Sequence, residues 1–307
     1  MRKDKKAHSS PDQLASKARR GDFQSIAQLL SLVEKDLPSA LTLLSKLKAK
    51  SSKQIKIGIT GPPGAGKSSL IGFLIQNFRE KKYRVGVLAV DPSSPFSGGA
   101  LLGDRIRMNR FAGDSDVFIR SVGSRGALGG LSAATGAMAR VLAFAGFDIL
   151  IIETVGVGQT ELQVMNLADI TAVVLVPESG DVIQTLKAGI LEIADCFIIN
   201  KSDRPGAELI AKELESLVEL EGVRKRKIFL TSVTGQKGLL ELGDSILKLG
   251  KEFAHERSRS QMKLRGELRS IIISAIDHQL QMALNGITIK DVYSSLSKVK
   301  IPKIKLK

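Results

Sequence analysis

The stretch "IKIGITGPPGAGKSSL", residues 55–70, decides the fold of the chain. An apolar run typical of a strand leads into a loop with three glycines and two prolines, and a lysine and two serines then open a segment with helical spacing. Residues 61–68, "GPPGAGKS", fit the pattern G-x-x-x-x-G-K-[ST] in the strand–loop–helix context that the pattern requires. The sequence therefore predicts a P-loop, which is a backbone cradle for the phosphates of a nucleoside triphosphate.

The residue types in this loop suit phosphate binding. Glycine lets backbone N–H groups converge on phosphate oxygens, and the N-terminus of the following helix adds a favourable dipole. Lys67 is expected to reach the β- and γ-phosphates, and the Ser68 hydroxyl is expected to ligate Mg²⁺. The residues predicted to surround the phosphates are Gly61, Pro62, Pro63, Gly64, Ala65, Gly66, Lys67, Ser68 and Ser69.

Six further runs rich in Val, Ile and Leu have the length of strands. They are "RVGVLAV", "VFIRS", "DILIIE", "ITAVVLVP", "CFIIN" and "KIFLT". Because the apolar residues are nearly continuous within these runs, they indicate a parallel sheet covered on both faces. Helix-length segments such as residues 69–82 and 208–220 lie between most of them. This rhythm predicts an α/β fold with a doubly wound, mostly parallel sheet, as in the G domains of P-loop NTPases.

The run "IINKSD" supplies the residues that select the base. Asn200, Lys201 and Asp203 form an N-K-x-D motif at the end of a later strand. A carboxylate at Asp203 accepts hydrogen bonds from both N1–H and the exocyclic amine of guanine, whereas adenine presents an acceptor at N1. "TSVTG" stands where GTPases place a last base-contacting loop, and its candidate residues are Ser232, Val233 and Thr234. The predicted ligands are GTP and GDP.

Acidic residues at strand ends are candidate magnesium ligands. Glu153 ends "DILIIE", a placement in which a carboxylate binds Mg²⁺ directly or through water. Gly156 follows in an E-x-x-G pattern, and its N–H is expected to approach a γ-phosphate. Asp91, at the end of "RVGVLAV", and Asp104 are further candidates, although a salt bridge to a neighbouring arginine explains Asp104 equally well. The predicted metal-binding residues are Ser68, Asp91, Asp104 and Glu153.

Helical segments are expected on both sides of this domain. Residues 12–50 space their apolar side chains at three and four, with Pro38 separating two helices and Ser39 as the N-cap of the second. Residues 261–284 have the pattern of one long helix. The sequence therefore predicts an N-terminal helical segment (1–53), a P-loop GTPase domain (54–250) and a C-terminal helical extension with a basic tail (251–307).

Composition argues against several other classes. Of the net charge of +15, residues 1–20 and 290–307 carry +5 each, which leaves +5 for the 269 residues between them. With 4% aromatic residues and no tryptophan, stacking platforms for nucleic acid are scarce. No apolar run approaches the ~18 residues that span a bilayer, residues 1–14 lack a secretory signal, and Cys196 is the only cysteine. We expect a cytoplasmic protein that binds neither nucleic acid nor a membrane.

Six longer motifs together resemble the MeaB/MMAA-type GTPases, a family also filed as LAO/AO transport system ATPases or the ArgK family. The motifs are "GITGPPGAGKSSL", "VDPSSPFSGGALLGDRIRM", "RGALGGLS", "ETVGVGQTE", "GDVIQTLKAGILEIAD" and "NKSD". Through residue 250 they cover nearly every loop on the expected ligand face. The resemblance implies a GTP-hydrolysing chaperone for an adenosylcobalamin-dependent acyl-CoA mutase, usually methylmalonyl-CoA mutase, that couples hydrolysis to cofactor loading and protection of the mutase.

The resemblance also implies a switch that responds to the partner. It covers Gly180–Lys187, and its Gln184 and Lys187 are candidates for contact with the nucleotide when the mutase is bound. Without the resemblance, these two residues are only the polar start of a helix. Together with Lys67 and Glu153, they are the residues expected to be catalytic.

The sequence departs from the family at a few positions, and it also contains a candidate surface for dimerisation. "SVGSRGALGG" differs slightly from the usual spelling around its arginine, Ser69 stands where threonine is frequent, and Val182 replaces an acidic residue, which puts in doubt how the switch is held. The family dimerises through a C-terminal helical extension, so the resemblance implies a homodimer. The apolar stripe available for this contact is Leu264, Leu268, Ile272 and Ile276.

Three other functions would require different sequence features. A kinase of periplasmic amino-acid transport proteins would need a phosphoacceptor site and tolerance of adenine, which the N-K-x-D motif opposes. A metal-insertion GTPase would need clustered Cys or His ligands, and His8, His255 and His278 are scattered. A cobalamin carrier would need the pattern D-x-H-x-x-G, which the sequence lacks. Methylmalonyl-, isobutyryl- and ethylmalonyl-CoA mutase are equally compatible with these residues as the partner.

Overall fold

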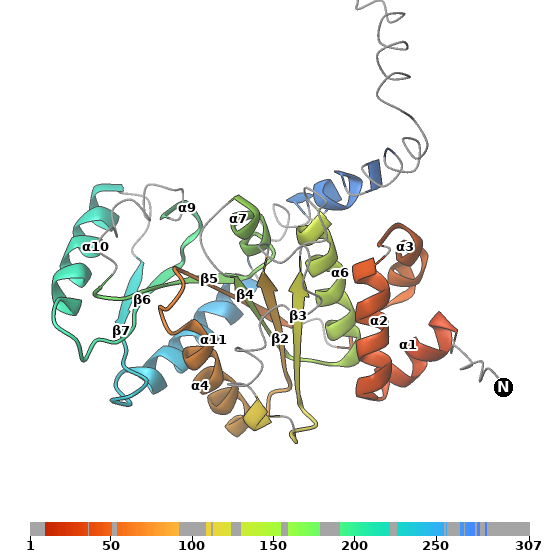
Figure 1. Cartoon of the computed structure of the whole chain (residues 1–307), viewed down its shortest axis with the longest axis horizontal. Coiled ribbons are helices and arrows are strands. Elements are labelled where there is room, and N and C mark those ends of the chain that lie inside the picture. Colours follow the sequence, from red (N-terminus) through yellow and green to blue (C-terminus); the bar gives the residue numbers. More distant parts are fainter. Residues whose placement is uncertain are drawn as a thin grey trace, which may run out of the picture.

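The sheet at the centre of the molecule has seven parallel strands in the order β3-β2-β4-β1-β5-β6-β7 (Figure 1). The computed structural model describes residues 10–35, 37–50, 54–91, 109–111, 113–123, 130–154, 159–178, 191–221, 226–254 and 256, and helical residues between 265 and 280. The strands are β1 (Ile55–Thr60), β2 (Val85–Asp91), β3 (Val117–Gly123), β4 (Ile149–Thr154), β5 (Ile170–Leu175), β6 (Cys196–Ile199) and β7 (Lys227–Leu230). All seven predicted strands and the predicted fold class are confirmed.

The loop after β1 lies where the winding of the sheet reverses. β2, β3 and β4 lie on one side of β1, and β5, β6 and β7 lie on the other. In open parallel sheets, ligands bind outside the carboxyl ends of the strands at such a switch point. The topology therefore places the P-loop, which follows β1, at the ligand-binding edge of the sheet.

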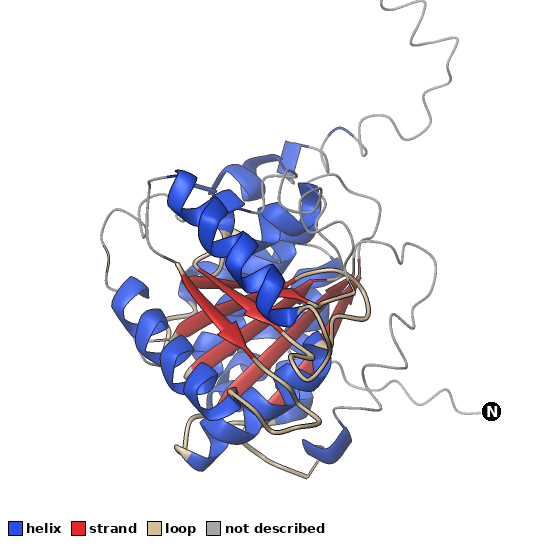
Figure 2. Cartoon of the chain, turned by 90° about the vertical axis from the view of Figure 1, so that its left-hand side faces the viewer, coloured by secondary structure: helices blue, strands red, loops and turns tan. Residues whose placement is uncertain are grey.

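Helices cover both faces of the sheet (Figure 2). One face carries α4 (Lys67–Glu80) and α11 (Leu239–Ala254), and the other carries α6 (Gly130–Ala145), α7 (Gln159–Met165) and α10 (Ala207–Glu221). Two short elements, η1 (Asn109–Phe111) and α9 (Leu191–Ile193), complete this part of the chain. Within the described ranges, no helix has both the length and the apolar character that a bilayer crossing demands.

The alternation of side chains along β4 separates the two cores. Ile149 and Ile151 join the core beneath α4 and α11, whereas Leu150 and Ile152 join the core beneath α6. Successive side chains of a strand point to opposite faces, so an uninterrupted apolar run serves a sheet that is buried on both sides. This is why the strands could be recognised from continuous Val, Ile and Leu.

Three N-terminal helices extend the layer that contains α6, at the right of Figure 1. They are α1 (Pro11–Arg19), α2 (Phe23–Lys35) and α3 (Leu37–Lys46). Their buried side chains belong to the same hydrophobic core as those of α6, β2, β3 and β4. The ring of Phe23 packs edge-on against that of Phe118 in β3, with 5.3 Å between the ring centroids. The N-terminal helices therefore share a core with the sheet.

The prediction for residues 12–50 was wrong in two details. Three helices are present instead of two, and α1 begins after Ser10, whose side chain forms a capping box with Gln13. Helix α3 begins at Leu37, so Pro38 lies in its first turn and Ser39 lies inside the helix instead of at its N-cap. Proline is tolerated there because the N–H groups of the first turn have no helical acceptor.

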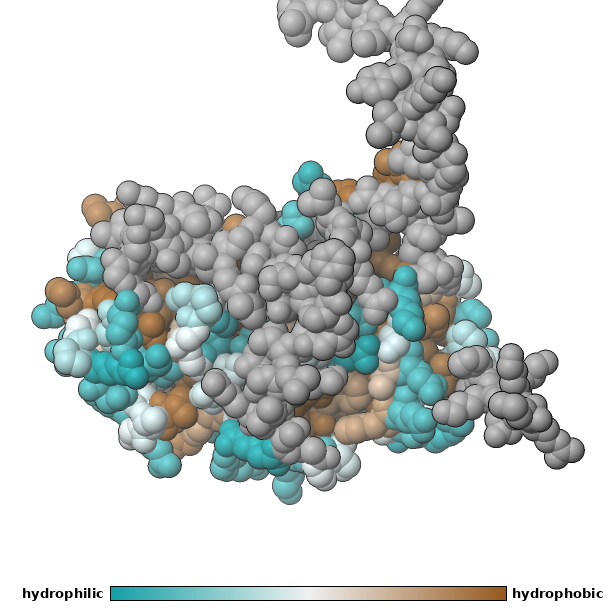
Figure 3. Space-filling model, in the orientation of Figure 1, coloured by the Kyte–Doolittle hydropathy of each residue, from teal (hydrophilic) through white to brown (hydrophobic). Residues whose placement is uncertain are grey.

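Apolar side chains are exposed on the C-terminal helical residues. Leu268, Ile272 and Ile276 are 48%, 56% and 57% exposed, and their four-residue spacing places them on one face. Ile271, on another face, packs against the core that contains α6. Hydrophobic residues of this region are visible in brown in the upper part of Figure 3. Leu264, the fourth member of the predicted stripe, lies outside the described residues.

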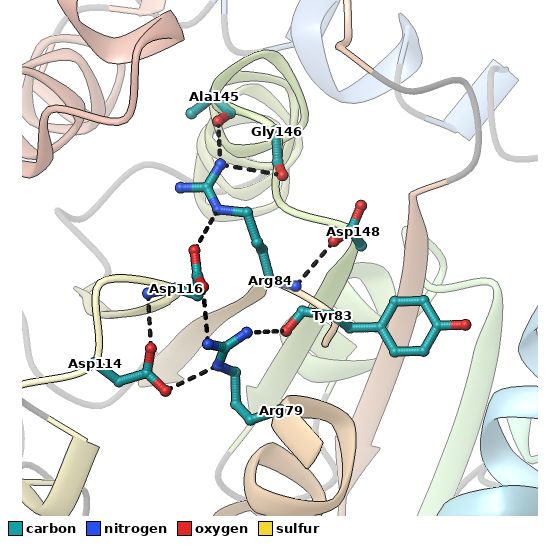
Figure 4. A network of polar contacts seen from close by, with 8 residues as sticks. All are labelled: Arg79, Tyr83, Arg84, Asp114, Asp116, Ala145, Gly146 and Asp148. Atoms are coloured by element: carbon teal, nitrogen blue, oxygen red, sulfur yellow. Dashed lines mark hydrogen bonds and ion pairs between the residues drawn. The ribbon is translucent and has the colours of Figure 1, made fainter. Parts of the chain in front are cut away.

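An ionic network joins the end of α4 to the residues that precede β3 and β4 (Figure 4). Arg79 donates from Nε to Asp114 and from Nη2 to Asp116, each at 2.8 Å. Arg84 donates from Nε to the other carboxylate oxygen of Asp116 at 3.0 Å, and its backbone N–H donates to Asp148 at 2.9 Å. The network therefore fixes the edge of the sheet opposite the P-loop.

Asp114→Asn is expected to lower stability at neutral pH and to have little effect in acid. The hydrogen bond from Arg79 holds the pKa of Asp114 below its usual range. Its contribution is therefore present above the ordinary carboxyl pKa of about 3.9 and is lost as the pH falls through the lower pKa of the folded state. We expect a loss of about 1–2 kcal/mol at pH 7, because both side chains are partly exposed.

Urea unfolding of the wild type and the variant, at pH 7 and at pH values below 4, measures this effect. Asp12→Asn is the matched control, because Asp12 pairs with Lys46 at 3.8 Å in a largely exposed contact. An equal loss of stability in Asp114→Asn at neutral and acid pH would contradict the ionic explanation.

Candidate functional site

The loop between β1 and α4 has a backbone that favours glycine at Gly61, Gly64 and Gly66, and at the first and last of these a side chain would also meet a neighbour. Gly61 has a φ of +144°, and a Cβ there would lie 2.1 Å from the carbonyl oxygen of Val174. Gly66 has a φ of +84°, and a Cβ there would lie 2.4 Å from Nδ2 of Asn200. Any larger residue would have to displace β5 or the residue after β6. The two glycines of the motif therefore let the loop lie directly against the strand ends.

Lys67, the first residue of α4, reaches across this loop. Its Nζ donates to the carbonyl oxygens of Gly61 at 2.8 Å and Pro62 at 2.9 Å, and the residue is only 6% exposed. An ammonium group carries three donors, so it can exchange these carbonyls for phosphate oxygens while remaining hydrogen-bonded. The lysine predicted to contact the β- and γ-phosphates thus lies at the centre of the loop.

Ser68 and Glu153 meet beside the loop, on the face of the sheet covered by α4. The Ser68 hydroxyl donates to Oε1 of Glu153 at 3.1 Å, and the two residues are 9% and 2% exposed. Glu153 reaches this position because β4 pairs directly with β1, so its carboxyl end lies beside the start of the P-loop. The fold therefore brings together two of the four predicted metal-binding residues, both with the oxygen donors that Mg²⁺ prefers.

Other predicted residues of the phosphate region lie beyond what the structure describes. Asp91 ends β2, but its side chain is outside the described part. Asp104, Gly156, Gln184 and Lys187 also lie outside the described residues. Their roles stay predictions.

Asn200 connects the base-binding loop to the P-loop, a role that sequence reasoning missed. Its Nδ2 donates to the carbonyl oxygen of Ala65 at 2.9 Å, and its Oδ1 accepts from the Thr231 hydroxyl at 3.3 Å. The residue is 2% exposed. One amide therefore joins the P-loop to the ends of β6 and β7. The N-K-x-D motif signals base recognition, but nothing in it reveals this second role.

Asp203 and Ser232 form the pair that is expected to recognise the base. The Ser232 hydroxyl donates to Asp203, and the N–H of Gly235 donates to that hydroxyl at 2.9 Å, so its own loop orients it. The hydrogen bond from Ser232 is the largest cause that lowers the pKa of Asp203, followed by the backbone N–H of Asp203 itself and the charges of Arg204 and Lys201. Asp203 is therefore ionised at neutral pH and available to accept hydrogen bonds.

The remaining residues of the base-binding region are held by local contacts. Lys201 has a φ of +57°, which is uncommon for a residue other than glycine. The turn around it is fixed by the N–H of Ser202, which donates to the Thr231 carbonyl at 2.9 Å. The Thr234 hydroxyl lies 3.2 Å from that of Ser232, and Val233 packs against the core beneath α4.

A groove of about 630 Å³ lies along α4, between η1 and the start of α11. Its lining follows α4 from Ser68 and Ser69 past Phe73 to Glu80, and it is completed by Arg110, Val233, Gln236, Leu239 and Leu240. This volume is within the range of about 300–1,000 Å³ that is usual for small-molecule sites. The groove borders the predicted nucleotide site at Ser68, Ser69 and Val233, but of the described residues neither Lys67 nor Asp203 lines it.

The chain is similar to known proteins over most of its length. Residues 26–285 match the protein family described as methylmalonyl Co-A mutase-associated GTPase MeaB. The Pyrococcus horikoshii protein PH0274, described as a GTPase, is 42% identical over 292 residues, which are 93% of this chain and 89% of that protein. The mitochondrial methylmalonic aciduria type A homolog of Mus musculus is 34% identical over 84% of this chain and 65% of its own length.

The fold of the chain is also similar to that of a solved structure. The crystal structure of a LAO/AO transport system kinase superposes on this chain with a TM-score of 0.68 and 25% identity, covering 90% of this chain and 87% of the other. The family match spans the P-loop, Glu153 and the N-K-x-D motif, and the P-loop fold is the one expected for GTP hydrolysis. The chain thus belongs to the MeaB family of methylmalonyl-CoA mutase-associated GTPases and is a P-loop GTP hydrolase.

Proposed function

We propose that the chain is the GTP-dependent chaperone of an adenosylcobalamin-dependent acyl-CoA mutase, with methylmalonyl-CoA mutase as the first partner to test. The observation that carries the proposal is the family match over residues 26–285, because it spans both the nucleotide site and the C-terminal helical residues. The name of the mouse relative refers to the same methylmalonyl chemistry. GTP binding and hydrolysis would drive loading of the cofactor into the mutase and its protection.

In this proposal the described residues bind GTP and GDP at three places. The P-loop N–H groups and Lys67 bind the phosphates, and Lys67 stabilises negative charge that develops on the phosphate oxygens. Asp203, oriented by Ser232, binds guanine. Ser68 and Glu153 would hold Mg²⁺, since their oxygens lie 3.1 Å apart at a buried position. The ion, when bound, supplies neutralisation of charge on the β- and γ-phosphates.

The proposed partner-responsive segment, Gly180–Lys187, follows residues that contact the base-binding loop. Glu178 forms an ion pair with Arg204, which is adjacent to Asp203. In this proposal the ion pair would connect the partner-responsive segment to the base-binding loop, as linkage between two binding sites requires. Lys187 is proposed to approach the transferring phosphate when the mutase is bound, in the manner of an arginine finger.

We also propose that the protein is a homodimer through its C-terminal helical residues. Leu268, Ile272 and Ile276 present an apolar stripe that is about half exposed at each position. A second copy would remove this stripe from water, and contiguous exposed apolar surface is typical of interaction sites. Light scattering of the intact chain measures its oligomeric state directly.

The cognate apo-mutase is expected to raise GTP turnover, and Lys187→Ala is expected to remove most of the increase. The basal rate should change little, because Lys187 acts in this proposal only when the partner is bound. Linkage also requires the mutase to prefer one nucleotide state of the GTPase, with a coupling of about 1–3 kcal/mol, or about 5- to 150-fold in affinity. GTP hydrolysis is measured with and without the mutase for the wild type, Lys187→Ala and Lys212→Ala. Lys212 is exposed on α10 and serves as the matched control.

Two outcomes separate the parts of this proposal. Stimulation that persists in Lys187→Ala would leave the chaperone function in place but would reject the role of this residue. No stimulation by any acyl-CoA mutase of the same cell would reject the chaperone function. A kinase of periplasmic amino-acid transport proteins, favoured by the similarity to the LAO/AO transport system kinase, would then be tested by phosphate transfer from labelled nucleotide to those proteins.

A further inference from the structure

Two threonines occupy the last positions of the neighbouring strands β1 and β4. The hydroxyl of Thr154 donates to the hydroxyl of Thr60 at 2.9 Å, and the two residues are 0% and 1% exposed. A hydrogen bond at this depth does not compete with water, so it contributes more to the free energy of unfolding than a surface hydrogen bond, and its loss costs more. It joins the residue before the P-loop to the residue after Glu153.

This hydrogen bond lies on the opposite face of the sheet from the contact between Ser68 and Glu153. Ile149 and Ile151 of β4 face α4, whereas Leu150 and Ile152 face α6. The same alternation places the Glu153 side chain toward α4 and the Thr154 side chain toward α6. One polar contact on each face therefore ties the carboxyl end of β4 to the start of the P-loop.

The threonine pair joins β1 to β4 at the point where their backbone pairing ends. Backbone pairing between β1 and β4 ends at the register of Ile59 and Glu153. The next residue of β1 is Thr60, after which the chain turns into the P-loop. The hydroxyl contact therefore extends the connection between the strands one residue beyond the last backbone pair. Packing alone does not call for threonine, because the neighbouring buried positions on this face of β4 are the apolar Leu150 and Ile152.

We infer that Thr154 is a positioning residue for the magnesium-binding part of the GTP site. By bonding to Thr60 it fixes how far the Glu153 carboxylate lies from Ser68, and so the separation of the two oxygen donors. The inference rests on the proposed Mg²⁺ role of Ser68 and Glu153, and it does not depend on which protein is the partner.

The test compares how Mg²⁺ retains bound GDP in variants of this pair. The release rate of a fluorescent GDP is measured with EDTA and with Mg²⁺. The EDTA rate divided by the Mg²⁺ rate reports how strongly the metal retains GDP, without any turnover. Thr154→Val keeps the shape of the side chain and removes the donor. We expect its ratio to fall about fivefold, the equivalent of one net hydrogen bond of ~1 kcal/mol. Its release rate in EDTA should match the wild type, and Thr154→Ser should keep the wild-type ratio.

The double variant Thr60→Val/Thr154→Val separates positioning from stability. Because the two hydroxyls are partners of each other, the two substitutions are coupled, and the loss of unfolding free energy of the double variant in urea should be smaller than the sum of the two single losses. Its ratio should nevertheless stay about fivefold below the wild type, because the contact is still absent.

Three results would overturn the inference or its premise, and they are distinguishable. A wild-type ratio in folded Thr154→Val, or in the double variant, would overturn the positioning role. Equal acceleration of release with Mg²⁺ and with EDTA would also overturn it, because that result indicates general loosening of the site. If the release of GDP from the wild type does not respond to Mg²⁺, and the wild type therefore behaves as Glu153→Gln is expected to, the proposed metal site is overturned and the inference with it.

Discussion

Asp203→Asn is expected to weaken GTP binding about 100-fold and to increase the affinity for xanthosine triphosphate. The carboxylate accepts hydrogen bonds from N1–H and the exocyclic amine of guanine, and an amide in its place turns a donor toward them. Each charge-assisted hydrogen bond that is lost corresponds to about 10- to 150-fold in affinity. Xanthine carries a carbonyl where guanine has the amine, so the asparagine amide can donate to it. Calorimetric titration with GTP, GDP, xanthosine triphosphate and ATP measures these affinities.

Ser232→Ala is the matched control for this experiment. It removes the hydroxyl that donates to Asp203 but keeps the negative charge, so we expect a loss of about tenfold or less and no gain for xanthosine triphosphate. Because the pKa of Asp203 lies below its usual range, the wild-type affinity for GTP should not depend on this group between about pH 5 and pH 8. Equal wild-type affinities for ATP and GTP would refute the assignment of guanine.

Lys67→Ala is expected to reduce GTP affinity by more than about 150-fold. Removing one partner of a buried charge pair costs about 3–5 kcal/mol, because the other charge stays in a site with little water. Lys67 is 6% exposed, and its ammonium group lies at the centre of the P-loop. GTP should lose more affinity than GDP, since the lysine is predicted to contact the γ-phosphate as well as the β-phosphate.

Lys248→Ala is the control for the change in net charge, because Lys248 is exposed on α11. Its GTP affinity should remain that of the wild type. Urea unfolding of both variants shows whether they remain folded, and a folded Lys67→Ala with unchanged GTP affinity would reject the role of the P-loop lysine.

The strands and the P-loop could be predicted because their determinants are local. A strand that is buried on both faces needs consecutive apolar residues, and a loop that wraps phosphates needs glycines at fixed spacing before a lysine and a serine. The N-K-x-D motif is equally local, and the structure places it at the end of β6, across from the P-loop. For these features, the residues that the structure requires lie next to one another in the sequence, so the pattern reveals them directly.

Contacts between distant residues could not be predicted in this way. The amide of Asn200 meets a carbonyl 135 positions earlier, and Arg79 meets a carboxylate 35 positions later. The threonine pair at the ends of β1 and β4 is likewise invisible until the order of the strands is known. The docking of the N-terminal helices also depends on a surface that a pattern of apolar spacing does not identify. These features depend on tertiary structure, which no single stretch of the chain encodes.

The N-terminal helices are synthesised long before the surface that they cover. Helix α2 ends at Lys35, whereas its partner α6 begins at Gly130. At ribosomal speeds of about 5–20 residues per second, roughly 5–20 s separate the two. During this interval Ile26, Leu29 and Leu30, which are fully buried in the finished protein, have no sheet to pack against, and short isolated helices are marginal in water. The nascent chain therefore passes through an aggregation-prone stage, in which holding chaperones at the ribosome exit are expected to determine the yield of folded protein.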